Sequence, residues 1–135
     1  MSRSVAKEFL HLREWLGRAT QLVDTGNDAY EANSLLQEAG DSLMMKIGET
    51  ANRLDRAGVE PPAGVRWSDA VSNRNWLIHQ YDEIDREVTW ATLTKSLPSW
   101  EEKLGATFEE AAAMLAGAGT ESRSTVLRKK PFGTE

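Results

Sequence analysis

The chain contains no cysteine and only two histidines, His11 and His79. The lack of cysteine excludes disulfide frameworks, thiol nucleophiles and zinc sites built on cysteine ligands. The two histidines are then the only soft metal ligands in the sequence. Any catalysis by this protein therefore has to use groups other than thiols.

Positive charge and long apolar runs are also scarce. The 135 residues include 16 Lys and Arg against 21 Asp and Glu, which gives a net charge of -5. This balance excludes a general nucleic-acid coat protein, since nonspecific binding needs many Lys and Arg contacts to phosphates, but it leaves room for a local basic site. No apolar run is long enough to span a membrane and no charged-then-apolar leader opens the chain, so we expect one compact cytoplasmic domain.

Helical periodicity fills most of the sequence. Apolar residues recur at spacings of three and four from Val5 to Val23, and the pattern returns from about residue 29 to residue 56. Within the second segment Gly40 stands where a leucine would otherwise lie, which predicts a close neighbour there. The segment 58–64, GVEPPAG, cannot be helical because of its adjacent prolines and flanking glycines.

Two further helices are predicted after this connection, over about 69–79 and 86–96. Ser68 is the expected N-cap of the first of them. Pro98 interrupts the second, and Ser99 begins a capping-box pattern. We therefore expect a fifth helical piece, or a kinked continuation, after the proline.

No segment shows the alternation of a strand, so the predicted fold class is all-α. Four or five helices joined by short loops bury their apolar stripes against each other in an up-and-down bundle. We place this helical domain at residues 1–116. The segment 117–135, rich in Gly, Ser, Thr and charge, is predicted to be a flexible C-terminal tail.

The predicted helix at 69–79 has an unusual arrangement of charged and aromatic residues. At about 100° per residue, Arg74 falls in the middle of the apolar side, whereas Trp76 falls on the opposite side. A guanidinium stays protonated in proteins and, on an apolar face, needs a carboxylate, a dipole or a ligand anion. The apolar side consists of Trp67, Ala70, Val71, Leu77 and Ile78.

Two interpretations of Arg74 follow from this placement. In one, Arg74 pairs with an acidic residue on a neighbouring helix, such as Glu49, and Trp76 covers another helix or a subunit interface. In the other, Arg74 and His79 together hold and cleave a phosphodiester. The two residues lie about 140° apart around an ideal helix and roughly 7.5 Å apart along it, so they do not share a face. Either the helix ends near His79 or a second chain completes the site.

The string RNWLIHQY, residues 74–81, resembles the motif of the HEPN superfamily, an arginine followed by four to six residues and a histidine. The tyrosine two places after the histidine makes it similar to the HepT toxin family. The segment 47–54 resembles the family's second-helix block, and 82–98 resembles the segment after the motif. The resemblance covers the chain in order and spacing up to about residue 116.

This resemblance implies an HEPN-type helical bundle that forms a homodimer and cleaves RNA without a metal ion or other cofactor. It implies a type VII toxin–antitoxin pair, in which an MntA-type nucleotidyltransferase silences the nuclease by transferring AMP to a tyrosine. By position, Arg74 and His79 are the catalytic pair, Asn75 is an auxiliary polar group and Tyr81 is the AMPylation site. Cleavage would use the ribose 2′-hydroxyl and leave 2′,3′-cyclic phosphate ends.

Alternatives remain open beside this interpretation. The chain could instead be a non-catalytic HEPN subunit of a nucleotidyltransferase, in which Arg74 holds nucleotide, or a purely structural helical protein. His11 is expected to be a surface histidine without a role. The carboxylates of Asp82, Glu83 and Asp85 suit either Mg²⁺ or, more simply, a loop and helix N-terminus.

The tryptophans and the basic end of the chain also have two interpretations each. Trp15, Trp67, Trp90 and Trp100 follow the apolar periodicity and are expected in the core or an interface, while Trp76 is a candidate dimer contact or base platform. The cluster of Arg123, Arg128, Lys129 and Lys130 is expected to be solvated, with RNA phosphates as the other possibility.

Overall fold

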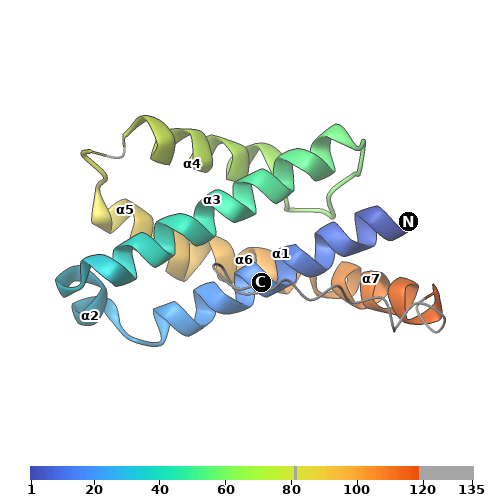
Figure 1. Cartoon of the computed structure of the whole chain (residues 1–135), viewed down its shortest axis with the longest axis horizontal. Helices are drawn as coiled ribbons and strands as arrows, with labels where there is room; N and C mark the ends of the chain where they lie inside the picture. The colour runs from blue at the N-terminus through green and yellow to red at the C-terminus, as the bar shows by residue number, and fades with distance from the viewer. Residues whose placement is uncertain (81, 119–135) are drawn as a thin grey trace, which may run out of the picture.

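The structure, a computed structural model, describes residues 1–80 and 82–118. These residues form helices and no strand, which confirms the predicted all-α class. Figure 1 shows the helices packed side by side along a common long direction. In chain order they are α1 (Arg3–Val23), α2 (Asn27–Ala32), α3 (Ser34–Arg56), α4 (Trp67–His79), α5 (Arg86–Ala91), the π-helical segment η1 (Thr92–Ser96), α6 (Leu97–Lys103) and α7 (Gly105–Ala118).

The α1 helix supplies much of the core of the bundle. It packs against α3 and against α6, η1 and α7. Its buried residues follow the predicted spacing of three and four, because that spacing places them on one face of a helix. They are Ala6, Phe9, Leu12, Leu16, Ala19 and Leu22.

The predicted helix over 29–56 is two helices, α2 and α3, separated at Asn33. The backbone of Asn33 is extended, with φ -127° and ψ 107°, and its Oδ1 accepts from the backbone N–H of Leu35 at 2.9 Å. An asparagine side chain that bonds to nearby backbone N–H groups favours a helix cap over a helix interior. Gly40 does meet a close neighbour, since a Cβ there would lie 3.1 Å from Leu93 Cδ1.

The chain stays helical through Pro98, so the predicted capping box at Ser99 is wrong. Ser96 has helical dihedral angles and η1 leads directly into α6, with Pro98 in the first turn of α6. A proline is tolerated there because its fixed φ is already that of a helix. The real break comes at Leu104, between α6 and α7. Of the two predicted outcomes, the continuation past the proline is therefore the correct one.

The α4 helix lies along α3, which provides nearly all of its helix contacts (Figure 1). The connection before it is non-helical, as predicted, and its glycines at 58 and 64 have φ values of 75° and 85°. Helix α4 begins at Trp67, whose indole N–H donates to the backbone oxygen of Val59 at 2.8 Å. The predicted N-cap at Ser68 is wrong, because Ser68 already lies inside the helix and Arg66 precedes it without a side-chain cap.

A polar cluster joins the start of α5 to α3 and α2. The Arg86 guanidinium donates to both carboxylate oxygens of Asp41, at 2.8 and 3.1 Å. It also lies 3.4 Å from the hydroxyl of Tyr30, which hydrogen-bonds to Thr89 at 2.6 Å. The hydrogen bond to Asp41 raises the pKa of Arg86, against the opposing effect of burial. This cluster fixes the chain shortly after the α4–α5 connection.

Helix α7 is described to Ala118, two residues past the predicted domain boundary at residue 116. Residues 119–135, which include the four basic residues of the predicted tail, lie outside the described residues. None of the described helices is both long and apolar enough to cross a membrane.

Candidate functional site around Arg74

Arg74 lies on the side of α4 that faces α3, as its position in the apolar pattern predicts. Its side chain is 17% exposed. Trp67 and Leu77 of the same helix are buried, and Ala70, one turn before Arg74, is partly buried. The helix therefore places a guanidinium at the margin of the core, where an unpaired charge is costly.

The contact of Arg74 with α3 depends on Gly48. A Cβ atom at position 48 would lie 2.5 Å from Arg74 Cβ and 2.8 Å from the backbone oxygen of Ala70. Glycine is required here for space rather than for its backbone angles, since its φ is not positive. Gly48 was not among the residues predicted from the sequence, although its position eight residues after Gly40 within α3 was a usable signal.

Two side chains hold the Arg74 guanidinium. Its Nη1 atom donates to Glu49 Oε1 at 3.3 Å, and its Nη2 atom donates to Asn75 Oδ1 at 3.0 Å. The Nε atom is buried and has no partner among the described residues. Of the five N–H groups that a guanidinium carries, these two contacts use one each. Three N–H groups are therefore left without a partner in the described part of the chain.

Glu49 is the partner of Arg74 that the structural interpretation predicts. The ion pair is a single contact at 3.3 Å, however, and the Glu49 side chain is 54% exposed. Exposed pairs of this kind contribute about 0–1 kcal/mol, since water and salt screen them. A phosphate that accepts two N–H bonds from Arg74 competes well with such a contact.

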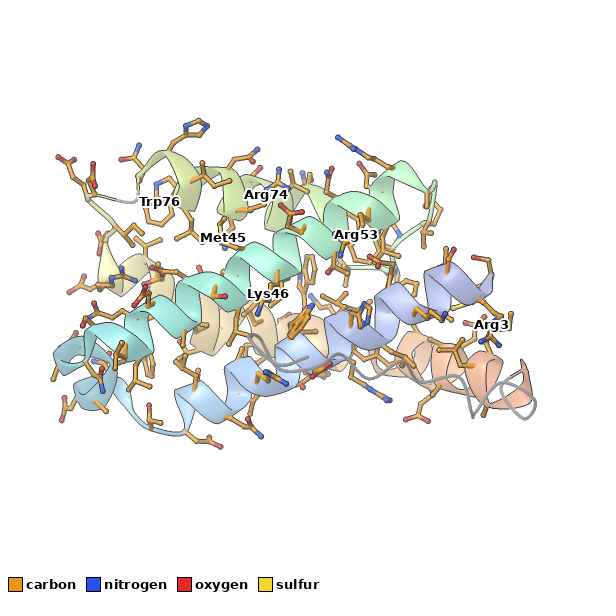
Figure 2. The ribbon with its side chains drawn as sticks, viewed as in Figure 1. Arg3, Met45, Lys46, Arg53, Arg74 and Trp76 are labelled. Carbon is orange, nitrogen blue, oxygen red and sulfur yellow. The ribbon has the colours of Figure 1, made fainter. Side chains whose placement is uncertain are left out.

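Glu49 is itself shared between two arginines. Its second oxygen lies 3.8 Å from Nη1 of Arg53, and Nε of Arg53 donates to Glu8 at 2.6 Å. Figure 2 shows Arg53 on α3 and Arg74 on the neighbouring α4. Charges of alternating sign thus run from Glu8 on α1 to Arg74 on α4.

His79 is the last residue of α4 and is exposed. The helix ends there, as one of the two predicted possibilities requires. Because α4 is helical from Arg74 to His79, the two residues remain about 140° apart around its axis and roughly 7.5 Å apart along it. The structure therefore brings Asn75 to Arg74 within one chain, but it does not bring His79 to Arg74. Tyr81 lies outside the described residues.

The indole of Trp76 is partly buried and packs against the core, on the side of α4 turned toward the bundle (Figure 2). The predicted outward orientation is therefore wrong, whereas packing of Trp76 against another part of the bundle agrees with the structural interpretation. Ile78, expected on the apolar side, is instead 45% exposed. Helix α4 packs mainly against α3, and this one neighbour determines which face of α4 is buried. The buried face is therefore rotated relative to the face that its apolar residues define.

The remaining candidates mostly follow their simpler interpretations. His11 is exposed, and Trp67 and Trp100 are buried, with Trp15 and Trp90 partly buried against the core. Asp85 caps α5 by accepting from the N–H of Glu87 at 2.9 Å. Within the described residues, no three histidine or carboxylate side chains cluster as a metal ion would require.

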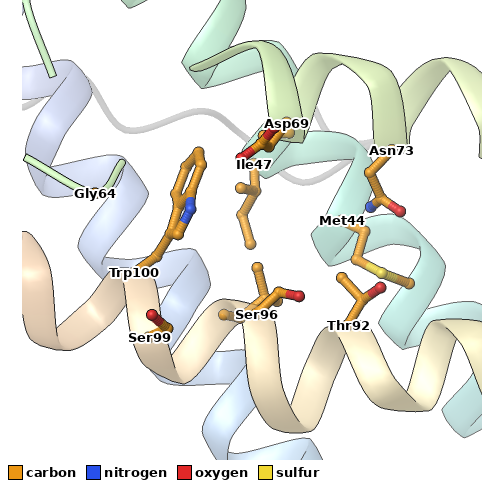
Figure 3. A pocket seen from close by; sticks show the side chains of 11 residues that line it. Met44, Ile47, Gly64, Asp69, Asn73, Thr92, Ser96, Ser99 and Trp100 are labelled. Atoms are coloured by element: carbon orange, nitrogen blue, oxygen red, sulfur yellow. The ribbon is translucent and has the colours of Figure 1, made fainter. Parts of the chain in front are cut away.

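A hollow of about 370 Å³ lies between α4, α3 and the η1–α6 segment (Figure 3). Met44, Ile47 and Trp100 give it apolar walls, and Asp69 and Asn73 are among its polar residues. No lysine or arginine of the described residues lines it. Because an anion needs donors or positive charge, this hollow is a poor phosphate site, and the free N–H groups of Arg74 are the better candidate.

The comparisons with known proteins agree with this assignment of the fold. No solved structure matches the chain. The family model described as "Ribonuclease HepT-like" matches residues 12–106, a span that contains Arg74, Asn75, His79 and Tyr81. The matched span is most of the chain and extends from α1 to the start of α7. The chain therefore belongs to the ribonuclease HepT-like family.

Proposed function

We propose that this protein is a metal-independent RNA endonuclease, the toxin of a HepT/MntA-type pair, and that AMPylation of Tyr81 neutralises it. The observation that carries the proposal is the Arg74 guanidinium, held beside Asn75 with one N–H group left over on each of its two terminal nitrogens, in a chain of a ribonuclease family. Such donors suit the charge that develops on phosphorus during cleavage.

The reaction uses the ribose 2′-hydroxyl as the nucleophile. A base removes its proton, the 2′-oxygen bonds to phosphorus, and the bond to the 5′-oxygen of the next nucleotide breaks as that oxygen takes up a proton. His79 suits these proton transfers, since an imidazole can both accept and donate a proton. Arg74 stabilises the five-coordinate phosphorus by charge-assisted hydrogen bonds. The products are a 2′,3′-cyclic phosphate and a free 5′-hydroxyl.

A homodimer supplies the groups that one chain lacks. One imidazole does not easily serve as both base and acid, and within a single chain His79 and Arg74 do not share a face of α4. Because His79 is exposed at the end of the helix, a second copy of the chain can approach it. Two motifs related by a two-fold axis would provide two arginines and two imidazoles around one phosphate.

Neutralisation follows from the same charges. The Tyr81 hydroxyl attacks the α-phosphorus of ATP in the antitoxin, pyrophosphate leaves, and the phenolic proton is lost. The product carries a phosphodiester anion and a purine on the residue two places after His79. This tethered group would occupy the donors of Arg74 that RNA needs.

The other candidate is a non-catalytic subunit in which Arg74 holds nucleotide. The contact of Arg74 with Glu49 supports this candidate, because the carboxylate already balances the charge of Arg74 and no reacting phosphate is required to do so. Cleavage of RNA by pure, unmodified protein in EDTA separates the two. The nuclease proposal expects activity that His79→Ala abolishes and His11→Ala retains. Loss of activity in EDTA, or equal activity in the two histidine variants, would contradict it.

A further inference from the structure

The carboxylate of Glu49 stands between two arginines from different helices. One oxygen accepts from Arg74 at 3.3 Å, and the other lies 3.8 Å from Arg53. Arg53 is in turn held by Glu8 of α1 at 2.6 Å. Since each oxygen faces a different cation, Glu49 does not engage both edges of the Arg74 guanidinium.

We propose that Glu49 is a positioning residue for Arg74, holding one N–H group of the guanidinium while leaving others free for a phosphate. Gly48, the residue before it, lets the stem of Arg74 lie against the α3 backbone. The Gly48–Glu49 pair thus fixes the arginine at both its base and its tip. This inference rests on the proposed function, because the phosphate is that of the RNA.

The negative charge of Glu49 has a second effect. It attracts the same guanidinium that a phosphate would bind and repels the phosphate itself, so it weakens binding of RNA in the ground state. Arg53 limits this effect by engaging the second oxygen. Without Arg53, both oxygens of Glu49 are free to turn to Arg74, in the bidentate geometry that carboxylates favour with arginine.

These two effects predict different changes in kcat and KM. Glu49→Ala removes the acceptor, so the guanidinium loses its orientation and kcat falls about tenfold. Glu49→Gln keeps an oxygen acceptor but removes the charge, so it restores most of that loss and lowers KM about threefold. Arg53→Ala raises KM, because the released carboxylate then competes with the phosphate.

Two residues of α3 provide matched controls. Glu38 and Arg56 are exposed. Within the described residues, neither side chain bonds to Arg74, Glu49 or Arg53. Glu38→Gln removes the same charge as Glu49→Gln, and Arg56→Ala removes the same charge as Arg53→Ala. We expect wild-type kcat and KM from Glu38→Gln, and a smaller rise in KM from Arg56→Ala than from Arg53→Ala.

The experiment is steady-state cleavage of one RNA by full-length wild type and these variants, with Tm recorded for each. A purely structural Glu49 would lower Tm while leaving kcat and KM equal to those of Glu38→Gln, and this result would overturn the inference. If wild type cleaves no RNA, the proposed function fails and binding of a 2′-O-methyl RNA oligonucleotide decides the role of Glu49. Tighter binding by Glu49→Gln than by Glu38→Gln supports it, whereas equal or absent binding overturns it.

Discussion

A Cβ atom at Gly48 would lie 2.5 Å from the Cβ atom of Arg74. The base of the arginine side chain therefore occupies the space that any larger residue at position 48 would need. Glu49, the next residue of α3, contacts the other end of the same side chain. Two consecutive residues of α3 thus determine where Arg74 of α4 lies.

Gly48→Ala is expected to destabilise the protein and to reduce cleavage of RNA. The added methyl group meets the Arg74 stem and the backbone oxygen of Ala70, so α4 has to move away from α3. Overpacking of this kind costs about 1–3 kcal/mol of unfolding free energy. Urea denaturation followed by circular dichroism measures the loss.

Gly17→Ala is the matched control, because Gly17 lies inside α1 and a methyl group added there would meet no atom within 4 Å. Alanine has the higher helix propensity, so this variant gains about 0.5–1 kcal/mol. Equal effects of the two substitutions would show that Gly48 is not a contact point between α3 and α4.

Asp41→Ala is expected to lower the unfolding free energy by about 1–3 kcal/mol, because it leaves the partly buried Arg86 without its bidentate partner. The pKa of Arg86 is raised in the folded state. Its stabilising contribution is thus fully present below the pKa of an unfolded arginine and is lost only as pH rises through the folded value. Arg86 stays charged near neutral pH, so the loss of unfolding free energy in Asp41→Ala should not change with pH in that range through titration of Arg86.

Glu14→Ala serves as the comparison for Asp41→Ala. Glu14 also bonds to an arginine at 2.8 Å, but this pair with Arg18 is about half exposed on both sides. Such a pair contributes at most about 0.5 kcal/mol. If chemical denaturation gave the same loss for both variants, burial would not be what makes the Asp41 pair stabilising.

In the proposed function AMP is transferred to the Tyr81 hydroxyl, so Tyr81→Phe, which lacks that hydroxyl, is expected to remain toxic when expressed and to resist the antitoxin. Intact mass spectrometry after expression with and without the nucleotidyltransferase measures the modification. Wild type should gain whole AMP increments and Tyr81→Phe none. AMP transfer to Tyr81→Phe with loss of toxicity would contradict the assignment of this residue.

The sequence predicted those parts of the fold that depend on the spacing of apolar residues along one helix. The stripe of α1 and the all-α class follow from that spacing alone. The break at Asn33 and the continuity through Pro98 depend on local hydrogen bonds and on where a proline falls within a turn, so residue spacing did not reveal them. The orientation of Trp76 depends on which helices contact α4, and one helix pattern does not contain that information.

The surroundings of Arg74 were predictable to the same degree, while its role in catalysis stays a proposal. The sequence singled out Arg74 because a charge in an apolar stripe is unusual, and it offered Glu49 as one possible partner, which the structure shows in contact with Arg74. Gly48 and the sharing of Glu49 with Arg53 involve three helices, and only the packing of α1, α3 and α4 brings those residues together.

The chemistry of the RNA ends is the decisive test of the nuclease proposal. Pure, unmodified protein is incubated with RNA in EDTA, and the 3′ ends of the products are analysed by mass spectrometry. We expect 2′,3′-cyclic phosphate from wild type and from His11→Ala, and no cleavage by Arg74→Ala or His79→Ala. Ends with a 3′-hydroxyl, or cyclic phosphate from His79→Ala at the wild-type rate, would contradict the proposal.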